Sequence, residues 1–433
     1  MPPHAARAAD AARPAAGGSG PPAAPSLPGV FRAPSPRFDL RAQRPEYIDQ
    51  VEERLRAAKA EVRTDVSAAA WAALGLAYEQ ALGARAAADA ERAAAERGCA
   101  PPRVDGDTLT QGDFAERFER PRRPCVLVGL ADKWPARAQG RWTLEALREE
   151  YAEERLKVGE DDEGYPVRLK LKYFLYYLFD AAVHQRDDAP LYLFDSTFGE
   201  DERKTRSLLD DFCVPPHFAE DLFQYAGERR RPPYRWLVVG GPRSGTWCHV
   251  DPLATSAWNT VLSGSKRWVL LPPETPKELV DPKGAGDDAA TWFSTVLPRV
   301  ARAADEGRCA RPLDFIQRQG ETVFVPDGWW HAVINLEPTV AITQNFCSTE
   351  NFRRCWRESL HGRQGMARKW LRRLRKVRPD LAAIADEESK TVVLKPRRRK
   401  GKKHKKDDKT HSHKHDASHD RDEKRARQHS PQR

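Results

Sequence analysis

Near its middle the chain reads Gly245-Thr246-Trp247-Cys248-His249-Val250-Asp251-Pro252, the one place where a histidine stands two residues before an aspartate. A second stretch also reads as a turn joined to a strand and contains another histidine. It is Phe324-Val325-Pro326-Asp327-Gly328-Trp329-Trp330-His331. Two imidazoles and one carboxylate that leave half of an octahedron open are the ligand set of non-haem ferrous oxygenases. The candidate metal ligands are therefore His249, Asp251 and His331.

A His-x-Asp motif alone is a weak signal, because a histidine on a β face is more often a satisfied core residue than a ligand. Lys266 strengthens the case, since it lies between the two stretches at the start of an apolar run. An inward-facing lysine costs several kcal/mol unless an anion pairs with it. The far carboxylate of a keto-acid cosubstrate would be such a partner.

Strand parity gives the first spatial expectations. His249 and Asp251 differ by two, so both should project to one face of a strand. A two-residue hairpin loop at Ser263-Gly264 would place Asn259 and Lys266 on one common face.

A second hairpin is expected near the end of the β-rich region. Glu337-Pro338 reads as a turn between the strands Trp330–Leu336 and Thr339–Phe346. Centred on Glu337, this hairpin would set His331 opposite Thr343. A hydroxyl group would then stand beside a metal ligand.

Length and composition bound the protein class. The 433 residues, 40% of them hydrophobic and twelve of them tryptophan, allow one large or two ordinary domains. Thirty-four prolines and a mean hydropathy of −0.72 indicate substantial unfolded flanks. No apolar run approaches the ~18 residues of a membrane span, so no membrane association is expected. Seven scattered cysteines without a Cys-x-x-Cys motif favour a reducing compartment.

The net charge of +10 is concentrated in the tail. From Lys395 to Arg433 there are 16 Lys/Arg and 6 Asp/Glu, so the rest of the chain is neutral overall. The run from Arg397 to Lys406 predicts a nuclear address or an RNA-binding arm, with a solubilising disordered tail as the equal alternative. The expected location is the nucleus, with the cytoplasm as the alternative. An Arg-containing, acid-poor N-terminus also leaves an organellar transit peptide open.

Helices leading into a run of short β-branched and aromatic strands predict an all-β, barrel-like core with flanking helices. The changes in composition divide the chain into five segments. These are a disordered Ala/Pro-rich N-terminus (1–36), a helical Ala-rich segment (37–98), a catalytic domain (101–350), a C-terminal helical lid or dimer segment (351–390) and a disordered basic, His-rich tail (395–433).

Three stretches, Thr246–Pro272, Gly320–Phe346 and Phe223–Glu228, resemble the JmjC-domain oxygenases. The similarity runs from about Val104 to about Asp386. It implies a double-stranded β-helix of the jelly-roll or cupin type that binds Fe(II) and 2-oxoglutarate at the open end of the barrel. It also implies residue roles: His249, Asp251 and His331 as iron ligands, and Lys266, Thr343, Asn259, Thr246 and Tyr192 as 2-oxoglutarate-binding residues.

The chemistry implied by this resemblance is decarboxylation of 2-oxoglutarate to succinate with O₂, coupled to hydroxylation of a substrate C–H bond, with ascorbate as a supporting reductant. Lysyl side chains of Lys/Arg-rich splicing or chromatin proteins are the favoured substrates. The alternatives are demethylation of N-methyl-arginine or N-methyl-lysine, hydroxylation of a nucleic acid, and a non-catalytic RNA-associated scaffold.

The C-terminal helical segment raises two further expectations. A homodimer is expected through these helices. Its cations, from Arg368 to Lys376, form either part of a nucleic-acid face or an ordinary solvated helix side.

Overall fold

The fold is described from a computed structural model. It describes residues 48–63, 67, 69, 82–179, 187, 189–283 and 288–391, and these described residues belong to one compact unit. The expectations for residues 1–36 and 395–433, and much of the Ala-rich segment, lie outside the described residues. In the described ranges no helix combines the length and the apolar character that crossing a membrane requires.

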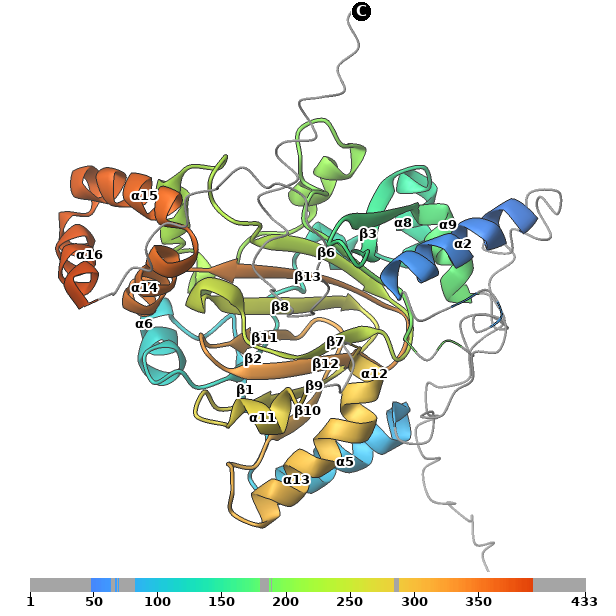
Figure 1. Ribbon diagram of the computed structural model, residues 1–433, viewed down its shortest axis with the longest axis horizontal. Coiled ribbons are helices and arrows are strands. Elements are labelled where there is room, and N and C mark those ends of the chain that lie inside the picture. The colour runs from blue at the N-terminus through green and yellow to red at the C-terminus, as the bar shows by residue number, and fades with distance from the viewer. Residues whose placement is uncertain are drawn as a thin grey trace, which may run out of the picture. The chain divides into compact units, whose positions relative to one another are not determined.

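Eight antiparallel strands form the centre of the fold (Figure 1). They are β6 (Arg235–Gly240), β7 (Gly245–His249), β8 (Ser256–Ser263), β9 (Lys266–Leu271), β10 (Leu313–Gln317), β11 (Thr322–Val325), β12 (Trp330–Asn335) and β13 (Thr339–Phe346). One sheet has the order β11-β8-β13-β6 and the other β10-β9-β12-β7. The chain crosses between the sheets at almost every step, which is the jelly-roll or double-stranded β-helix topology. The expected all-β core is confirmed.

Shorter strands extend or flank this core. The larger sheet continues through β1 (Arg103–Asp105) and β2 (Cys125–Val128) at one edge and β5 (Tyr192–Asp195) at the other, which gives seven strands. A separate two-stranded sheet pairs β3 (Arg155–Glu160) with β4 (Pro166–Lys170).

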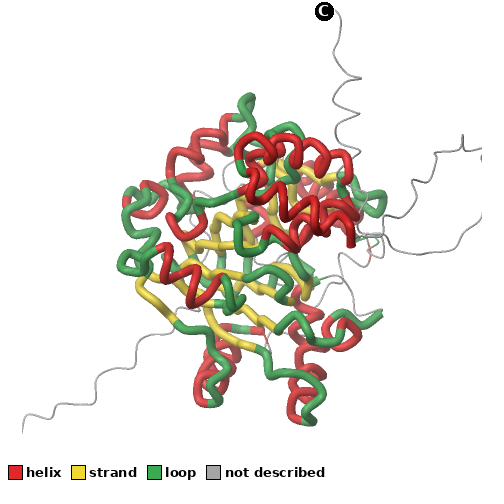
Figure 2. Tube along the Cα trace, turned by 90° about the vertical axis from the view of Figure 1, so that its left-hand side faces the viewer, coloured by secondary structure: helices red, strands yellow, loops and turns green. Residues whose placement is uncertain are grey.

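Helices cover the outer faces of both sheets, as the red segments around the yellow strands in Figure 2 show. They are α2 (Ile48–Val62), α5 (Ala84–Glu96), α6 (Gln111–Phe114), α7 (Pro135–Ala138), α8 (Leu144–Tyr151), α9 (Leu171–Phe179), α11 (Lys277–Val280), α12 (Ala289–Thr291), α13 (Leu297–Asp305), α14 (Phe352–Gly362), α15 (Gln364–Val377) and α16 (Pro379–Thr391). The shorter turns are the π-helices η2 (Ala115–Glu119) and η7 (Trp292–Val296) and the 3₁₀-helices η3 (Lys204–Asp211), η4 (Pro216–Phe218), η5 (Leu222–Ala226) and η6 (Pro252–Ala254).

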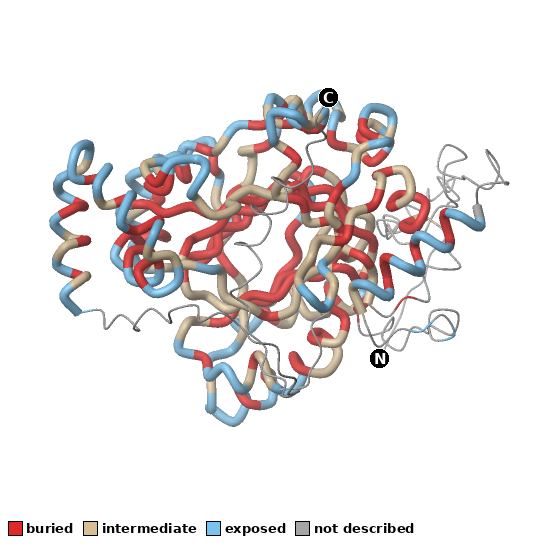
Figure 3. The backbone as a smooth tube through the Cα atoms, turned by 45° about the horizontal axis from the view of Figure 1, so that its top comes forward, coloured by how far each residue is buried: buried red, intermediate tan, exposed pale blue. Residues whose placement is uncertain are grey.

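Alternation along the strands separates an outer face from an interior between the sheets. On β8, Trp258 and Leu262 belong to the outer core under the N-terminal helices. Ala257 instead joins a buried cluster with Trp268 and Val333 of the opposite sheet. This cluster is the packed interior of the sandwich, where the strands in Figure 3 are coloured as buried.

Both expected hairpins are wrong. β8 pairs with β11 and β13, whereas β9 pairs with β10 and β12. The turn with Gly264 at φ +82° therefore carries the chain from one sheet to the other. The Glu337-Pro338 turn does the same, so β12 and β13 do not pair and Thr343 faces Asn259 and Trp236 instead of His331. The turn residues were identified correctly, but the strands that follow them pair with partners distant in sequence.

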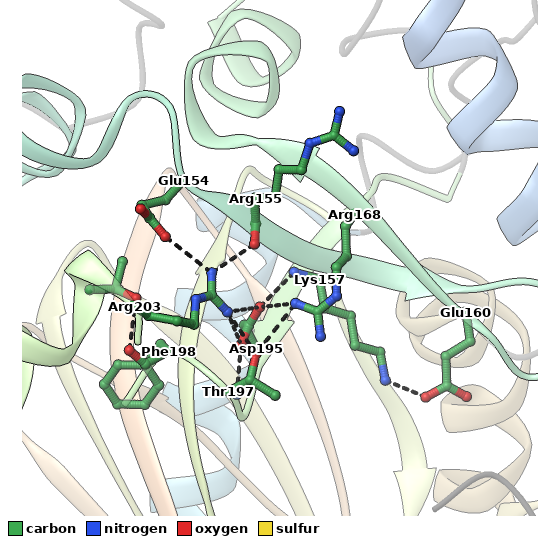
Figure 4. Close-up of polar contacts among 10 residues, drawn as sticks. Glu154, Arg155, Lys157, Glu160, Arg168, Asp195, Thr197, Phe198 and Arg203 are labelled. Atoms are coloured by element: carbon green, nitrogen blue, oxygen red, sulfur yellow. Dashed lines mark hydrogen bonds and ion pairs between the residues drawn. The ribbon is translucent and has the colours of Figure 1, made fainter. Parts of the chain in front are cut away.

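A buried carboxylate fastens the β3–β4 pair to β5 (Figure 4). Asp195 accepts hydrogen bonds from the amides of Lys157 (2.8 Å) and Thr197 (2.7 Å) and from the guanidinium groups of Arg168 (3.0 Å) and Arg203 (3.3 Å). Burial alone would raise the pKa of this carboxyl, but the amide of Lys157 and the charges of Arg203 and Arg168 outweigh burial and lower the pKa. The network fixes the end of the strand whose first residue is Tyr192.

Asp195→Ala is expected to destabilise the fold by about 3 kcal/mol, because it leaves buried donors without their acceptor. The free energy of unfolding in urea measures the loss. Glu153→Gln is the control, since this exposed carboxylate pairs with Lys170 and Lys172 at the surface and its substitution should cost less than about 1 kcal/mol. Because folding lowers the pKa of Asp195, its contribution exists above the unfolded-state pKa and is lost as the pH falls through the folded-state value. Equal losses in the two variants would contradict a special role for Asp195.

Candidate active site

The three candidate metal ligands meet at one end of the interior. His249 is the last residue of β7, and its Cα pairs with that of His331 on β12. Their ring centroids are 4.2 Å apart. Asp251 lies just beyond β7, not on the strand as parity predicted, yet its Oδ1 is 4.0 Å from His331 Nε2. One ligand atom from each of the three lies within 4.8 Å of the other two.

Backbone carbonyl groups fix the orientation of both imidazoles. The Nδ1 of His249 is 2.8 Å from the carbonyl oxygen of Trp247, and the Nδ1 of His331 is 3.2 Å from that of Trp329. A carbonyl oxygen only accepts, so each Nδ1 carries the proton and donates it. In the neutral tautomer that this contact selects, the lone pair lies on Nε2, which is the arrangement that orients metal-bound histidines in proteins.

The carboxylate of Asp251 supports the same assignment. Its Oδ2 is buried and has no hydrogen-bond partner among the described residues. A buried, unsatisfied carboxylate oxygen is costly unless a cation binds it. Two imidazoles oriented through Nδ1, with one carboxylate whose Oδ2 has no partner in the described part of the chain, fit a divalent iron ion.

Lys266 is the second unusual group of the interior. It begins β9, its side chain is 1% exposed, and burial lowers its pKa to about 7. Its Nζ donates to Asn335 Oδ1 at 2.7 Å and lies 3.3 Å from the hydroxyl oxygen of Tyr192. In the described part of the chain, no carboxylate forms an ion pair with it. The site therefore presents a buried amine whose charged form an anionic ligand would stabilise.

The other four sequence-predicted residues lie on β5, β8, β13 and β7. Tyr192 on β5 contacts Lys266 as described. Asn259 and Thr343 are Cα partners on β8 and β13, and the buried Asn259 Oδ1 has no hydrogen-bond partner within the described ranges. Thr343 donates its hydroxyl to the Trp258 carbonyl. Thr246 lies on β7 before His249, opposite Val333. Their role in binding 2-oxoglutarate stays a prediction.

The sequence reasoning missed Asn335. Its Oδ1 accepts from Lys266, while its Nδ2 donates to the Ser244 hydroxyl at 2.9 Å, and Ser244 donates to the Gly241 carbonyl. This chain of hydrogen bonds turns the Asn335 oxygen toward the lysine. Parity carried the signal, because Asn335 is four residues after His331 on one strand and so shares its face.

The loop after Asp251 holds a strained backbone. Leu253 and Ala254 have φ of +57° and +52°, a region that L side chains other than Asn and Asp rarely adopt. The C-terminal helices hold the loop in place: Leu253 packs on their apolar core, and the Cys355 thiol of α14 donates to the Ala254 carbonyl at 3.0 Å. Strain of this kind persists only where the surroundings enforce it, and it concentrates at functional sites.

Comparison with known proteins gives the family. The Cupin-like domain family matches residues 111–352, more than half of the chain. The protein named bifunctional arginine demethylase and lysyl-hydroxylase psr-1 of Caenorhabditis elegans is 47% identical over 287 residues, which cover 65% of this chain and 70% of the relative. This chain belongs to the cupin-like JmjC family. The resemblance inferred from the sequence is therefore confirmed.

More distant JmjC relatives differ in their names. Lysine-specific demethylase JMJ21 of Arabidopsis thaliana is 40% identical over 253 residues, covering 56% of this chain and 25% of the relative. The 2-oxoglutarate and iron-dependent oxygenase JMJD4 of Mus musculus is 27% identical over 266 residues, covering 58% of this chain and 61% of the relative. The JmjC chain described here thus shares its core with proteins named for hydroxylation and for demethylation.

Proposed function

We propose that this chain is an Fe(II)- and 2-oxoglutarate-dependent oxygenase that hydroxylates lysyl side chains of Lys/Arg-rich proteins. The observation that carries the proposal is the pairing of two groups inside one sandwich. A His-Asp-His cluster brings two imidazoles and a carboxylate within 4.8 Å of one another, and the buried Oδ2 of Asp251 has no hydrogen-bond partner among the described residues. A buried lysine, which forms no ion pair with a carboxylate of the described ranges, projects into the same interior. The names of the relatives support the same activity.

Different residues of the chain would bind the metal ion and the cosubstrate. His249, Asp251 and His331 would hold ferrous iron, which supplies the O₂ activation coupled to decarboxylation of 2-oxoglutarate. Lys266 would bind the far carboxylate of 2-oxoglutarate through a charge-assisted hydrogen bond, and the Tyr192 hydroxyl oxygen lies 3.3 Å from its Nζ. The apolar interior beside Trp268 excludes water from these charges and strengthens their attraction.

The lowered pKa of Lys266 makes the affinity for 2-oxoglutarate pH-dependent. In the free protein the amine loses its proton near pH 7. A bound carboxylate favours the charged amine and raises that pKa, so binding takes up a proton above pH 7. The KM for 2-oxoglutarate is expected to rise with pH above 7, by at most about tenfold per pH unit.

Two measurements check this dependence. Initial rates over a range of pH give the KM, and calorimetry in two buffers of different ionisation enthalpy counts the protons taken up. A KM that is flat from pH 7 to pH 9 would contradict a lysine that is half-neutral in the free protein.

Demethylation is the second candidate function, because relatives are named arginine-specific and lysine-specific demethylases. The same C–H hydroxylation on an N-methyl carbon gives an unstable N-hydroxymethyl group, which releases formaldehyde and leaves the amine with one methyl fewer. The site chemistry is identical, so only the target carbon distinguishes the two functions.

Mass spectrometry of products tests the proposal. Lys/Arg-rich peptides, some N-methylated, are incubated with the protein, ferrous iron, 2-oxoglutarate and ascorbate, with Asp251→Ala as the control. Gain of one oxygen on lysine, absent from the control, supports hydroxylation. Loss of a methylene with formaldehyde release assigns demethylation instead. Bound iron without succinate formation or peptide change would overturn the enzymatic proposal.

We also propose a nuclear location, supported by the basic run from Arg397 to Lys406. Splicing and chromatin proteins are the substrate class that this location would provide. The tail is also the proposed contact for RNA, through sequence-independent and salt-dependent phosphate binding. Imaging of the full chain beside a variant with neutralised tail residues separates the nucleus from the cytoplasm.

A further inference from the structure

The outer face of α15 is basic along its whole length. Its 14 residues contain no acidic side chain. Six cations are exposed: Arg368, Lys369, Arg372, Arg373, Arg375 and Lys376. The opposite face packs into the core of the C-terminal helices, which lie together at one side of the sandwich in Figure 1.

The six cations form two rows. Arg368, Arg372 and Arg375 follow the i, i+4, i+7 spacing, as do Lys369, Arg373 and Lys376, so each row follows one side of the helix. Residues four apart are about 6 Å apart along the axis. The rows are one residue out of phase and therefore about 100° apart around the axis. The helix thus presents two parallel lines of positive charge.

Nearly all of this charge lacks a counter-charge. Among the residues that the structure describes, only Arg375 of the six has a carboxylate partner, Asp386 of α16. The arginines of α14 differ, because Arg353 and Arg357 pair with Glu388 and Arg354 pairs with Asp327. The α15 face is therefore the part of the C-terminal helices that is left to attract an anionic partner.

The composition of the face decides the kind of partner. A protein interface needs apolar or aromatic anchors in its centre, but the aromatic residues of α14–α16 (Phe352, Trp356 and Trp370) are all buried, and the exposed apolar Val377 stands at the end of α15, beyond the six cations. A second copy of this chain would bring like charges together. A polyanion needs no such anchor, because release of its counterions supplies the binding free energy. The partner that fits is a nucleic-acid backbone.

The form of the nucleic acid follows from the same surface. Single-stranded nucleic acids are bound by stacking bases on exposed aromatic side chains, which this face does not offer. A helix is about 10–12 Å wide and fits the ~12 Å major groove of B-form DNA. The deep, narrow major groove of A-form RNA does not admit it. We propose that the basic face of α15 binds duplex DNA by contacting the phosphates on both sides of the major groove, without reading the base sequence.

A charge-reversal pair tests the proposal. Arg372→Glu with Arg373→Glu removes one cation from each row. The matched control is Arg299→Glu with Arg302→Glu, two exposed arginines on α13. Both variants keep the basic tail and change the net charge equally. Fluorescence anisotropy with a labelled mixed-sequence DNA duplex gives Kd for each full-length protein between about 50 and 200 mM salt.

In the α15 variant the affinity for the duplex is expected to fall about tenfold or more, and the slope of log Kd against log salt by about 2, one for each lost phosphate contact. The control should stay within about threefold of wild type, because salt screens charges remote from the DNA. Equal losses in the two variants, or no loss in the α15 variant, overturn the proposal.

Two further outcomes would also overturn it. If single-stranded RNA binds more tightly than duplex DNA and depends equally on α15, the assigned nucleic acid is wrong. If charge reversal instead changes the sedimentation coefficient in the absence of DNA, the face belongs to an interface between copies. Unchanged thermal melting and succinate formation establish that the variant is folded.

Discussion

Asp251→Ala is expected to lower 2-oxoglutarate turnover at least about 10³-fold, because the cluster loses its one anionic ligand. A metal ion contributes several kcal/mol to such reactions, and each 1.36 kcal/mol corresponds to tenfold in rate. Succinate formation with saturating 2-oxoglutarate measures the loss, and equilibrium dialysis measures iron retention.

The stability of the metal-free protein gives an independent readout. The buried Asp251 Oδ2 has no hydrogen-bond partner in the part of the chain that the structure describes, so removing the carboxylate should leave the free energy of unfolding unchanged or higher. Asp314→Ala is the control, since this carboxylate accepts two hydrogen bonds from Arg267, at 2.9 and 2.7 Å. Its loss should cost about 2 kcal/mol and leave iron binding intact. Clear destabilisation of the metal-free Asp251→Ala protein would identify the aspartate as structural.

Asn335→Asp is expected to raise the KM for 2-oxoglutarate about 10²-fold, which corresponds to about 3 kcal/mol. The substitution places a carboxylate where the asparagine oxygen now lies, 2.7 Å from Lys266 Nζ. The internal ion pair then competes with the carboxylate of 2-oxoglutarate for the lysine. It also raises the pKa of Lys266, so the pH dependence of KM expected for wild type should disappear.

Asn335→Leu separates charge from hydrogen bonding. It removes the accepting oxygen without adding a negative charge, so its KM should lie between those of wild type and Asn335→Asp, and its pH dependence should persist. If the two variants raise KM equally, Asn335 acts through packing and not through the charge state of Lys266.

The sequence predicted which segments form the strands of the sandwich, but not which strands pair with one another. Alternation and β-branched residues identify the strands, since these signals are local. The turns at Gly264 and Pro338 were assigned to hairpins because strands close in sequence usually pair. Here the facing sheet offers a buried partner surface, and each turn joins two sheets. His331 and Thr343 still share the interior, because alternation within each strand does not depend on the neighbouring strand.

Sequence reasoning identified those site residues whose burial without a ligand would cost free energy. Lys266 stood out because a buried amine needs an anion. Asn335 gave no such signal, since an asparagine in a strand is unremarkable until its partner is known. Asp195 was missed for a similar reason, because its donors come from segments distant in sequence.

The strained loop at Leu253 and Ala254 determines how far the chain could be shortened while the proposed iron site keeps its shape. Every proposed iron ligand precedes residue 350, yet the loop after Asp251 keeps its shape only while α14 covers it. A fragment that ends at the last strand would retain all ligands but let this backbone relax, and its affinity for iron should fall. Deletion of the C-terminal helices would therefore disturb the proposed iron site together with the proposed DNA contact, whereas substitutions on the outer surface of α15 would affect the DNA contact alone.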